Sequence, residues 1–270
     1  MFGNNWPPIQ LMPMIERMVE VATDAATAAG RGILEIYREG SPEAVMKADN
    51  SPVTIADRSS QAIIGDYLLG TGLPVISEED VVMDYQTRKS WEYCWLVDPL
   101  DGTKEFIAGT GEFTVNIGLV CRGRPVAGVI YIPCSDALYV GSAETGVYKR
   151  HAGHLRRLRA AGSRSRLEDL RKKSPLRAVG SRFHSSTATE EFVKQFSNVE
   201  FIMAGSSLKF MLLVEEEADL YPRLGRTMEW DTAAAHAILN AANRGIYRQD
   251  LSGELVYNKQ DLSNPYFMAF

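Results

Sequence analysis

Two carboxylates that lie close together in the sequence are the first sign of chemistry in this chain. In Trp95–Phe106, WLVDPLDGTKEF, we expect an apolar strand to stop at Asp98, where Pro99 turns the chain and Asp101 brings back a second carboxylate. Carboxylates at a strand end suit a hard, oxygen-seeking cation such as Mg²⁺. A helix that begins at Thr103 would offer backbone amides to a phosphate. The segment therefore predicts a joint metal and phosphate site; an acidic surface turn is the alternative.

Other acids in the chain could join this turn. Glu78 and Glu79 follow a short expected strand at 74–77, and an exposed acidic loop is their alternative role. Asp231 precedes an alanine-rich helix, where capping of the helix N-terminus is the alternative. Asp57, taken by itself, would be an ordinary surface acid. These residues become candidates only if the fold brings them to the DPLDGT turn.

The elements that must position these residues mix helices with strands. Apolar residues at three- and four-residue steps predict helices at 11–38 and 54–69, with a turn at 47–52 between them. A third helix is expected at 206–217, and a fourth at 231–243 that Gly245 would end. Strands are expected at 74–77, 93–97, 113–120, 126–132, 138–140, 146–148, 176–180 and 199–203. Because the two types do not alternate regularly, we predict layered sheets and helices.

Composition excludes several classes of function. The chain has 270 residues and a net charge of −5, with an isoelectric point near 5.5, which argues against general affinity for nucleic acid. Three cysteines without CxxC spacing predict no disulfide framework and a reducing compartment. No apolar stretch is long enough to span a membrane, and the first ten residues lack the pattern of a signal peptide. A soluble cytoplasmic protein is expected.

One basic segment stands out from this acidic background. Residues 149–177 contain eleven lysines or arginines against only Glu168 and Asp169. A solvated connector between two lobes is the first interpretation, and a surface that attracts polyanions is the other. We expect the lobe boundary within 145–175, which gives an N-terminal lobe at 1–150 and a C-terminal lobe at 151–270.

Taken together, the motifs resemble the lithium-sensitive, magnesium-dependent phosphatases of the inositol monophosphatase superfamily. Both signatures of that superfamily are present, as DPLDGT at 98–103 and WDTAAA at 230–235. Within it, the chain resembles the CysQ branch, the 3′(2′),5′-bisphosphate nucleotidases. The stretches that carry this second resemblance are KADNSPVT at 47–54, VISEED at 75–80, the segment 95–107, GEFTVN at 111–116, GSSLKF at 205–210 and LYPRLG at 220–225.

The resemblance implies a fold and a set of metal ligands. The fold would be α+β or α/β, a layered αβαβα sandwich whose active site lies between the two lobes. Glu78, Asp98 and the carbonyl of Leu100 would hold one Mg²⁺, and Asp98, Asp101 and Asp231 a second, with room for a third ion near Glu78. The N-terminal lobe would carry most ligands, and Li⁺ is expected to inhibit.

The resemblance also implies how water and phosphate are handled. Thr103, hydrogen-bonded to Asp57, would orient and help deprotonate the attacking water, and Glu78 would count with them as catalytic. The amides of Gly102 and Thr103 would bind phosphate oxygens. The implied substrate-binding set is Glu78, Leu100, Asp101, Gly102, Thr103, Ser206, Ser207, Lys209, Arg223 and Asp231.

The position of Arg223 favours a substrate with two phosphates, because a guanidinium can bind a phosphate through two hydrogen bonds. Ser206, Ser207 and Lys209 would complete that pocket, although Lys209 could instead be a solvated helix residue. The expected reaction removes the 3′-phosphate of 3′-phosphoadenosine 5′-phosphate to give AMP, with the sulfated analogue as a second substrate.

Two alternative functions remain open at this point. An inositol monophosphatase or fructose-1,6-bisphosphatase would use the same metal chemistry, and a non-catalytic metal or nucleotide sensor could keep the fold. The expected partner is a small molecule, not nucleic acid. Peripheral association with the inner face of the cell membrane and the oligomeric state are left undecided.

Overall fold

The computed structural model describes residues 12–40, 45–46, 52–181 and 187–270. Its helices are α1 (Met12–Glu39), α2 (Ile55–Leu69), α3 (Tyr85–Arg88), α4 (Thr103–Ile107), α5 (Leu167–Leu170), α6 (Thr187–Val193), α7 (Leu208–Val214) and α8 (Ala233–Ala241), with 3₁₀ turns η2 (Pro133–Ser135) and η3 (Glu229–Asp231). No described helix is long and apolar enough to cross a membrane.

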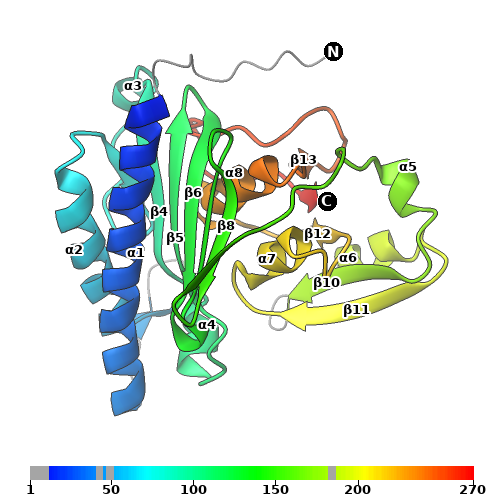
Figure 1. Ribbon diagram of the computed structural model, residues 1–270, viewed down its shortest axis with the longest axis horizontal. Helices are drawn as coiled ribbons and strands as arrows, with labels where there is room; N and C mark the ends of the chain where they lie inside the picture. Colours follow the sequence, from blue (N-terminus) through cyan, green and yellow to red (C-terminus); the bar gives the residue numbers. More distant parts are fainter. Residues whose placement is uncertain (1–11, 41–44, 47–51, 182–186) are drawn as a thin grey trace.

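A mixed sheet forms the first half of the molecule. It has seven strands in the order β3-β4-β5-β6-β7-β8-β9, and only the β3–β4 pair is parallel. Helices α1 and α2 cover one face, and α8 packs on the other (Figure 1). Its strands are β3 (Val75–Ser77), β4 (Tyr93–Asp101), β5 (Thr114–Cys121), β6 (Arg124–Ile132), β7 (Ala137–Ser142), β8 (Gly146–His151) and β9 (His154–Arg157).

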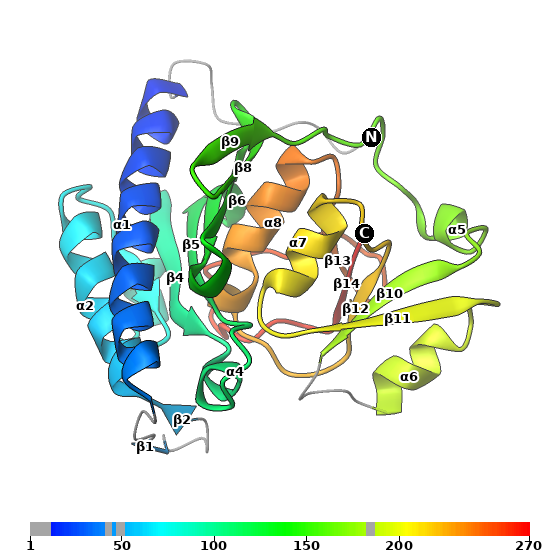
Figure 2. The ribbon, with the colours of Figure 1, turned by 60° about the horizontal axis from the view of Figure 1, so that its bottom comes forward.

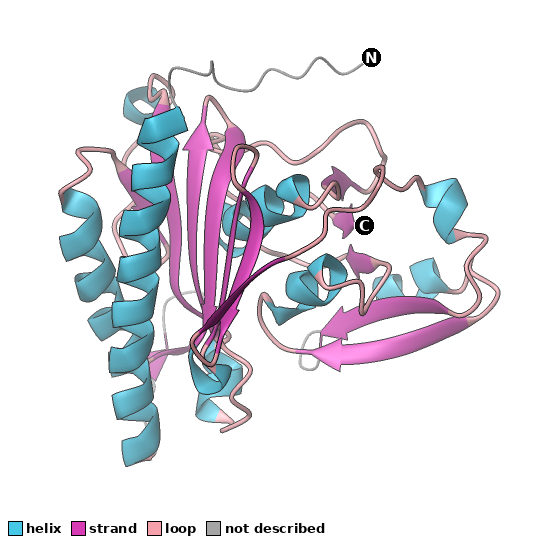
Figure 3. Cartoon of the chain, viewed as in Figure 1, coloured by secondary structure: helices cyan, strands magenta, loops and turns pink. Residues whose placement is uncertain are grey.

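Shorter strands form the second half. A parallel pair, β10-β11, meets the three-stranded sheet β12-β14-β13 through a bridge between Ala178 and Leu220. Helices α7 and α8 lie between these strands and the large sheet, and α5 and α6 lie at the far side (Figure 3). The strands are β10 (Leu176–Ser181), β11 (Val199–Ala204), β12 (Tyr221–Arg223), β13 (Ile246–Arg248) and β14 (Phe267–Ala269), and a separate pair is β1 (Val45–Met46) with β2 (Pro52–Val53). The expected αβαβα layering is confirmed.

Three apolar clusters fill the spaces between these layers. One lies between α1, α2 and the large sheet, and includes Ile33 and Trp95. A second joins the other face of that sheet to α7, α8 and the smaller strands, and a third, around Phe196, lies on the outer side. The second cluster contains residues from both halves of the chain, so the burial of its apolar side chains holds the two halves together.

A row of glycines lets α8 approach the large sheet closely. Gly118, Gly128 and Gly141 are direct cross-strand partners on β5, β6 and β7. A Cβ on Gly128 would lie 2.1 Å from the carbonyl oxygen of Ala234, and one on Gly141 would lie 2.7 Å from the Cα of Ile238. Because only glycine leaves room for a helix backbone at this distance, the row sets the position of α8 against the sheet (Figure 2).

The helix expected at 54–69 is confirmed: α2 begins at Ile55, and Thr54 is its N-cap. The strand that we expected to stop at Asp98 instead runs to Asp101, with an irregularity in its register between these two residues. The turn of the chain is therefore a bulge within the strand, which the rigid Pro99 accommodates without a ladder hydrogen bond.

Two other element boundaries differ from expectation. The helix at 206–217 is limited to Leu208–Val214. After α8, Asn243 adopts the left-handed backbone (φ 58°) that ends the helix, a role we had assigned to Gly245. Asparagine tolerates this conformation better than other non-glycine residues, because its short side chain can hydrogen-bond locally. In the turn expected at 47–52, residues 47–51 lie outside the described residues.

The first part of the basic segment 149–177 belongs to the large sheet, because it contains β9 and the second half of β8. Strand β9 pairs with β8 and completes the first sheet, so by topology we propose that the first lobe extends through Arg157. Much of the basic charge is neutralised within the chain, which favours the connector over a polyanion surface. The ion pairs are Lys149 and Arg156 with Glu215, Arg164 with Glu254, and Lys173 and Arg177 with Asp219.

Candidate active site

The bulge in β4 presents Asp98 at the edge of the core. Its side chain is 2 % exposed, and its Oδ1 accepts a hydrogen bond from the backbone N of Leu100 at 3.1 Å. The hydroxyl of Ser60 on α2 donates to the carbonyl of Pro99 at 2.6 Å. Helix α2 therefore holds the bulge, and with it the orientation of the buried carboxylate.

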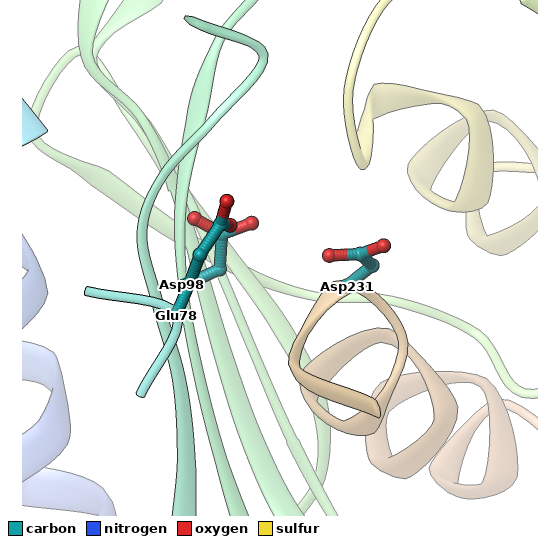
Figure 4. A group of neighbouring side chains, drawn as sticks. All are labelled: Glu78, Asp98 and Asp231. Atoms are coloured by element: carbon teal, nitrogen blue, oxygen red, sulfur yellow. The ribbon is translucent and has the colours of Figure 1, made fainter. Parts of the chain in front are cut away.

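Three acids from separate parts of the chain meet at this point. Ligand oxygens of Glu78, Asp98 and Asp231 all lie within 4.8 Å of one another. Glu78 follows β3, which runs parallel to β4, and its backbone N donates to Val97 at 3.2 Å. Asp231 approaches from the opposite side, at the turn that precedes α8 (Figure 4). The sequence motifs that contain these residues thus converge on one site.

Burial and mutual repulsion make this cluster unfavourable without a cation. Burial, followed by the charges of Glu78, Asp101 and Asp231, raises the pKa of Asp98 well above its usual range. The pKa of Asp231 is raised for the same reasons, burial first and then Asp101 and Glu78. A divalent cation among these carboxylates would remove the repulsion, and a donor set made only of oxygens suits Mg²⁺. The residues present therefore fit such an ion.

A hydroxyl–carboxylate pair lies beside the cluster. Thr103 Oγ1 donates to Asp57 Oδ1 at 3.1 Å, and Leu100 O lies 3.4 Å from the same hydroxyl. The other carboxylate oxygen of Asp57 accepts both the backbone N and the hydroxyl of Thr54, at 2.7 and 2.6 Å. Asp57 is thus a capping residue of α2 as well as the partner of Thr103, and it is buried. Because Asp57 is only 2 % exposed, the alternative that it is an ordinary surface acid is excluded.

The carboxylate of Asp101 is held by hydroxyls from the second half of the chain. Ser206 Oγ and Ser207 Oγ donate to its Oδ2 at 2.7 and 2.8 Å. We had placed both serines in the pocket for a second phosphate; in this structure their hydroxyl protons are directed at Asp101. Gly102, the next residue, has φ 94° and is the N-cap of α4, the short helix that begins at Thr103.

Lys209 on α7 and Arg223 on β12 lie in the second half of the chain. Lys209 is 6 % exposed, which excludes the solvated alternative, and its Nζ donates to the carbonyl of Ser206 at 2.6 Å. Burial lowers the pKa of Lys209 to about 8. Arg223 lines a cleft of about 320 Å³, together with Ser181, Glu190, Phe201 and Met203 among others. The cleft combines apolar walls with charged groups, as small-molecule sites do.

Comparison with known proteins now gives the family. Residues 14–264 match the inositol monophosphatase family. The chain belongs to that family. It is 40 % identical over 255 residues to the 3′(2′),5′-bisphosphate nucleotidase CysQ of Escherichia coli K12. The matched region covers 93 % of this chain and 98 % of the relative. It is 32 % identical over 263 residues to CysQ of Haemophilus influenzae, with 96 % of this chain and 94 % of the relative covered.

Solved structures of the inositol monophosphatase family agree with the fold. The crystal structure of CysQ from Bacteroides thetaiotaomicron has a TM-score of 0.81 and 43 % identity, covering 94 % of this chain and 96 % of that chain. Inositol monophosphatase from Anabaena shares the fold, with a TM-score of 0.70 at 23 % identity, over 96 % and 91 % of the two chains. The predicted superfamily is thus confirmed, and so is the predicted resemblance to the CysQ branch.

Sequence reasoning missed several residues of the site. Thr114 and Asn116 hydrogen-bond around Asp101, and Glu112 Oε2 accepts the backbone N of Gly205 at 2.9 Å. A signal for the first two was available, because they are polar residues at alternate positions of an otherwise apolar strand and must share one face. The apolar cleft residues Phe201 and Met203 carried no comparable signal.

Proposed function

We propose that the protein is a Mg²⁺-dependent 3′(2′),5′-bisphosphate nucleotidase that hydrolyses the 3′-phosphate of 3′-phosphoadenosine 5′-phosphate to AMP. The observation that carries the proposal is the convergence of Glu78, Asp98 and Asp231 beside the Thr103–Asp57 hydrogen bond. Relatives with 40 % identity over almost their whole length are named as nucleotidases of this kind. The 3′-phosphoadenylyl sulfate analogue is a second proposed substrate.

The cations would be held by carboxylates and one carbonyl. We assign Glu78, Asp98 and the carbonyl of Leu100 to one ion, and Asp98, Asp101 and Asp231 to a second. Bound cations would supply Lewis acidity, which lowers the pKa of water and offsets negative charge on phosphate oxygens. We expect Li⁺ to inhibit by competing for one of these positions.

The remaining chemistry belongs to Thr103, Asp57 and the start of α4. As water attacks phosphorus, Thr103 Oγ1 accepts a proton from it and passes its own proton to Asp57 Oδ1, 3.1 Å away. The bond between phosphorus and the 3′ oxygen breaks, and the 3′ oxygen takes a proton from solvent. Asp57 cannot turn away, because two groups of Thr54 hold its second oxygen. The first amides of a helix lack partners within the helix, so those of Gly102 and Thr103 bind the phosphate oxygens.

Recognition of the second phosphate is assigned to Lys209 and Arg223. The Lys209 ammonium donates one hydrogen bond to the Ser206 carbonyl, and its two other protons can be donated to a phosphate. Arg223 lies in the cleft of about 320 Å³ whose apolar residues, Phe201 and Met203, would contact the uncharged part of the substrate. A cation in this position favours a bisphosphate over a sugar alcohol phosphate, whose hydroxyl groups an acid would recognise better.

The proposal is tested by phosphate release from three substrates with Mg²⁺, each with and without Li⁺. The substrates are 3′-phosphoadenosine 5′-phosphate, inositol 1-phosphate and fructose 1,6-bisphosphate. We expect preference for the adenosine bisphosphate and its loss with Li⁺. Preference for a sugar phosphate would overturn the substrate assignment, and no release from any of the three would favour a non-catalytic sensor.

A matched pair of variants on one helix tests the catalytic assignment. Asp57→Asn should reduce turnover at least 100-fold, the usual scale of a general-base contribution. Asp66→Asn changes an exposed acid of the same helix and should leave turnover unchanged. Equal activity of the two variants would refute the role of Asp57.

A further inference from the structure

The carboxylate of Asp101 accepts its hydrogen bonds through a single oxygen. Its Oδ2 accepts Ser206 Oγ at 2.7 Å, Ser207 Oγ at 2.8 Å and Asn116 Nδ2 at 3.2 Å. Among the described residues, every hydrogen bond to this carboxylate ends on Oδ2, and the longer contact of Thr114 Oγ1, at 3.5 Å, also ends there. Three good donors saturate one carboxylate oxygen, which leaves Oδ1 available for another ligand.

All polar atoms of the Asn116 side chain form hydrogen bonds within the network around Asp101. Its two amide protons serve Asp101 Oδ2 and Ser207 Oγ, the latter at 2.9 Å, and its Oδ1 accepts Thr114 Oγ1 at 2.8 Å. Thr114 Oγ1 also lies 2.8 Å from Ser206 Oγ. Thr114 and Asn116 are 0 % and 1 % exposed, so they act within the protein and not on a partner in solvent.

The network joins the two lobes. Thr114 and Asn116 belong to β5 of the large sheet, whereas Ser206 and Ser207 lie in the connection between β11 and α7. Ser207 Oγ also lies 3.4 Å from the carbonyl of Asp231, the acid that precedes α8. Asp101 and Asp231 are therefore tied to each other and to both lobes by buried groups, which are costly to leave unpaired.

We propose that Asn116 and Thr114 are positioning residues that hold Asp101 by Oδ2, so that Oδ1 faces the cation and the metal site is complete only when the lobes are joined. This inference rests on the proposed function for the assignment of Asp101 as a ligand. Loss of such supporting hydrogen bonds typically weakens metal binding about 10- to 100-fold.

The experiment measures Mg²⁺ binding by titration calorimetry in the absence of substrate. Thr114→Val keeps the shape of the side chain and removes its hydroxyl, whereas Thr114→Ser keeps the hydroxyl. Asn116→Leu removes the amide altogether. We expect Kd for Mg²⁺ to rise about tenfold or more in Thr114→Val and Asn116→Leu, and to stay within about threefold in Thr114→Ser.

A variant away from the site separates positioning from general stability. Ser142→Ala removes another fully buried hydroxyl, on β7, that pairs with Thr145. Urea unfolding in a chelator gives the stability of each variant, and Ser142→Ala should lose stability without a change in Kd. The positioning role is refuted if Thr114→Val and Thr114→Ser have the same Kd for Mg²⁺. It is also refuted if the loss of Mg²⁺ affinity follows the loss of stability across all variants.

The same titration distinguishes this inference from the proposed function. If the wild-type protein binds no Mg²⁺, the metal assignment of the proposed function fails. If the wild-type protein binds Mg²⁺ and the variants bind it equally well, only the positioning role fails. Asn116→Leu places an apolar group in a polar network and could prevent folding, in which case the Thr114 pair decides.

Discussion

Substitution of Gly128 by alanine tests whether the close packing of α8 on the sheet builds the site. The added Cβ would lie 2.1 Å from the carbonyl oxygen of Ala234, 2.8 Å from its carbonyl carbon and 2.9 Å from its Cα. Contacts between carbon and oxygen are normally about 3.3 Å or longer. Since the obstruction is helix backbone, no side-chain rotation can relieve it, and α8 must move by roughly 1 Å.

The expected loss of stability follows from the size of this clash. Overpacking of a core costs about 1–3 kcal/mol, and the upper end applies because backbone must shift on both sides. A loss of about 3 kcal/mol would lower Tm by roughly 6–12 °C in a chain of this size. Asp231 lies two residues before α8, so the same shift would move it from the acidic cluster. A displacement of about 1 Å can cost about 100-fold in turnover.

Thermal unfolding and phosphate release on the same preparation provide the assay. Gly65→Ala is the matched control, because a Cβ at Gly65 on α2 meets nothing within 4 Å. It should raise stability by about 0.5–1 kcal/mol, the usual effect of this change within a helix. If Gly128→Ala unfolds at the wild-type temperature with wild-type turnover, the glycine row does not set the helix position and the reasoning is refuted.

Three further predictions concern charged groups. Asp98→Asn should reduce turnover below about 1 %, yet raise Tm of the metal-free protein, because burial and neighbouring carboxylates raise the pKa of Asp98 and make its charge costly. Arg223→Ala should raise KM for the adenosine bisphosphate at least about tenfold more than KM for a monophosphate, since it removes a bidentate phosphate contact. Burial raises the pKa of Asp219, but hydrogen bonds from Arg177 and Lys173 outweigh it and bring the pKa to about 2. This lowered pKa stabilises the fold at pH above the unfolded value of 3.8, by about 2 kcal/mol, and the contribution is lost as pH falls from about 5 to about 2.

Each of these has a result that would contradict it. Retention of more than a few per cent of wild-type turnover in Asp98→Asn would remove it from the ligand set. Equal effects of Arg223→Ala on both substrates would place the second phosphate elsewhere. For the third, urea unfolding of Asp219→Asn is compared with wild type at pH 7 and pH 3; a difference that does not shrink at low pH would argue against the ion-paired carboxylate as its cause.

Local sequence was sufficient to predict features whose residues lie close together in the chain. The DPLDGT motif predicted a metal and phosphate site, and the alternation of apolar residues placed most helices and strands. Thr54 with Asp57 three residues on is also a local N-cap pattern, which we did not use because we took Asp57 by itself for a surface acid. Such features depend on contacts within a few residues, which a sequence displays directly.

Other features depend on contacts between distant segments. Whether β4 would stop at Asp98 or bulge and continue was decided by pairing with β5 and by Ser60, which is 39 positions away from Pro99. Ser206 and Ser207 carry polar groups that could serve a substrate equally well. Only the fold, which places them 2.7 and 2.8 Å from Asp101, directs their protons to that carboxylate.

The sequence by itself determined the family, the acidic residues and the kind of cation they suit, because ligand type and local spacing are written in the order of residues. The tertiary structure alone decided how close the acids come and what orients them. We predict that this closeness depends on α8 lying against three glycines and on the buried network around Asp101. Long-range packing of this kind arises from the sum of many weak apolar contacts over the whole chain, and no short motif encodes it.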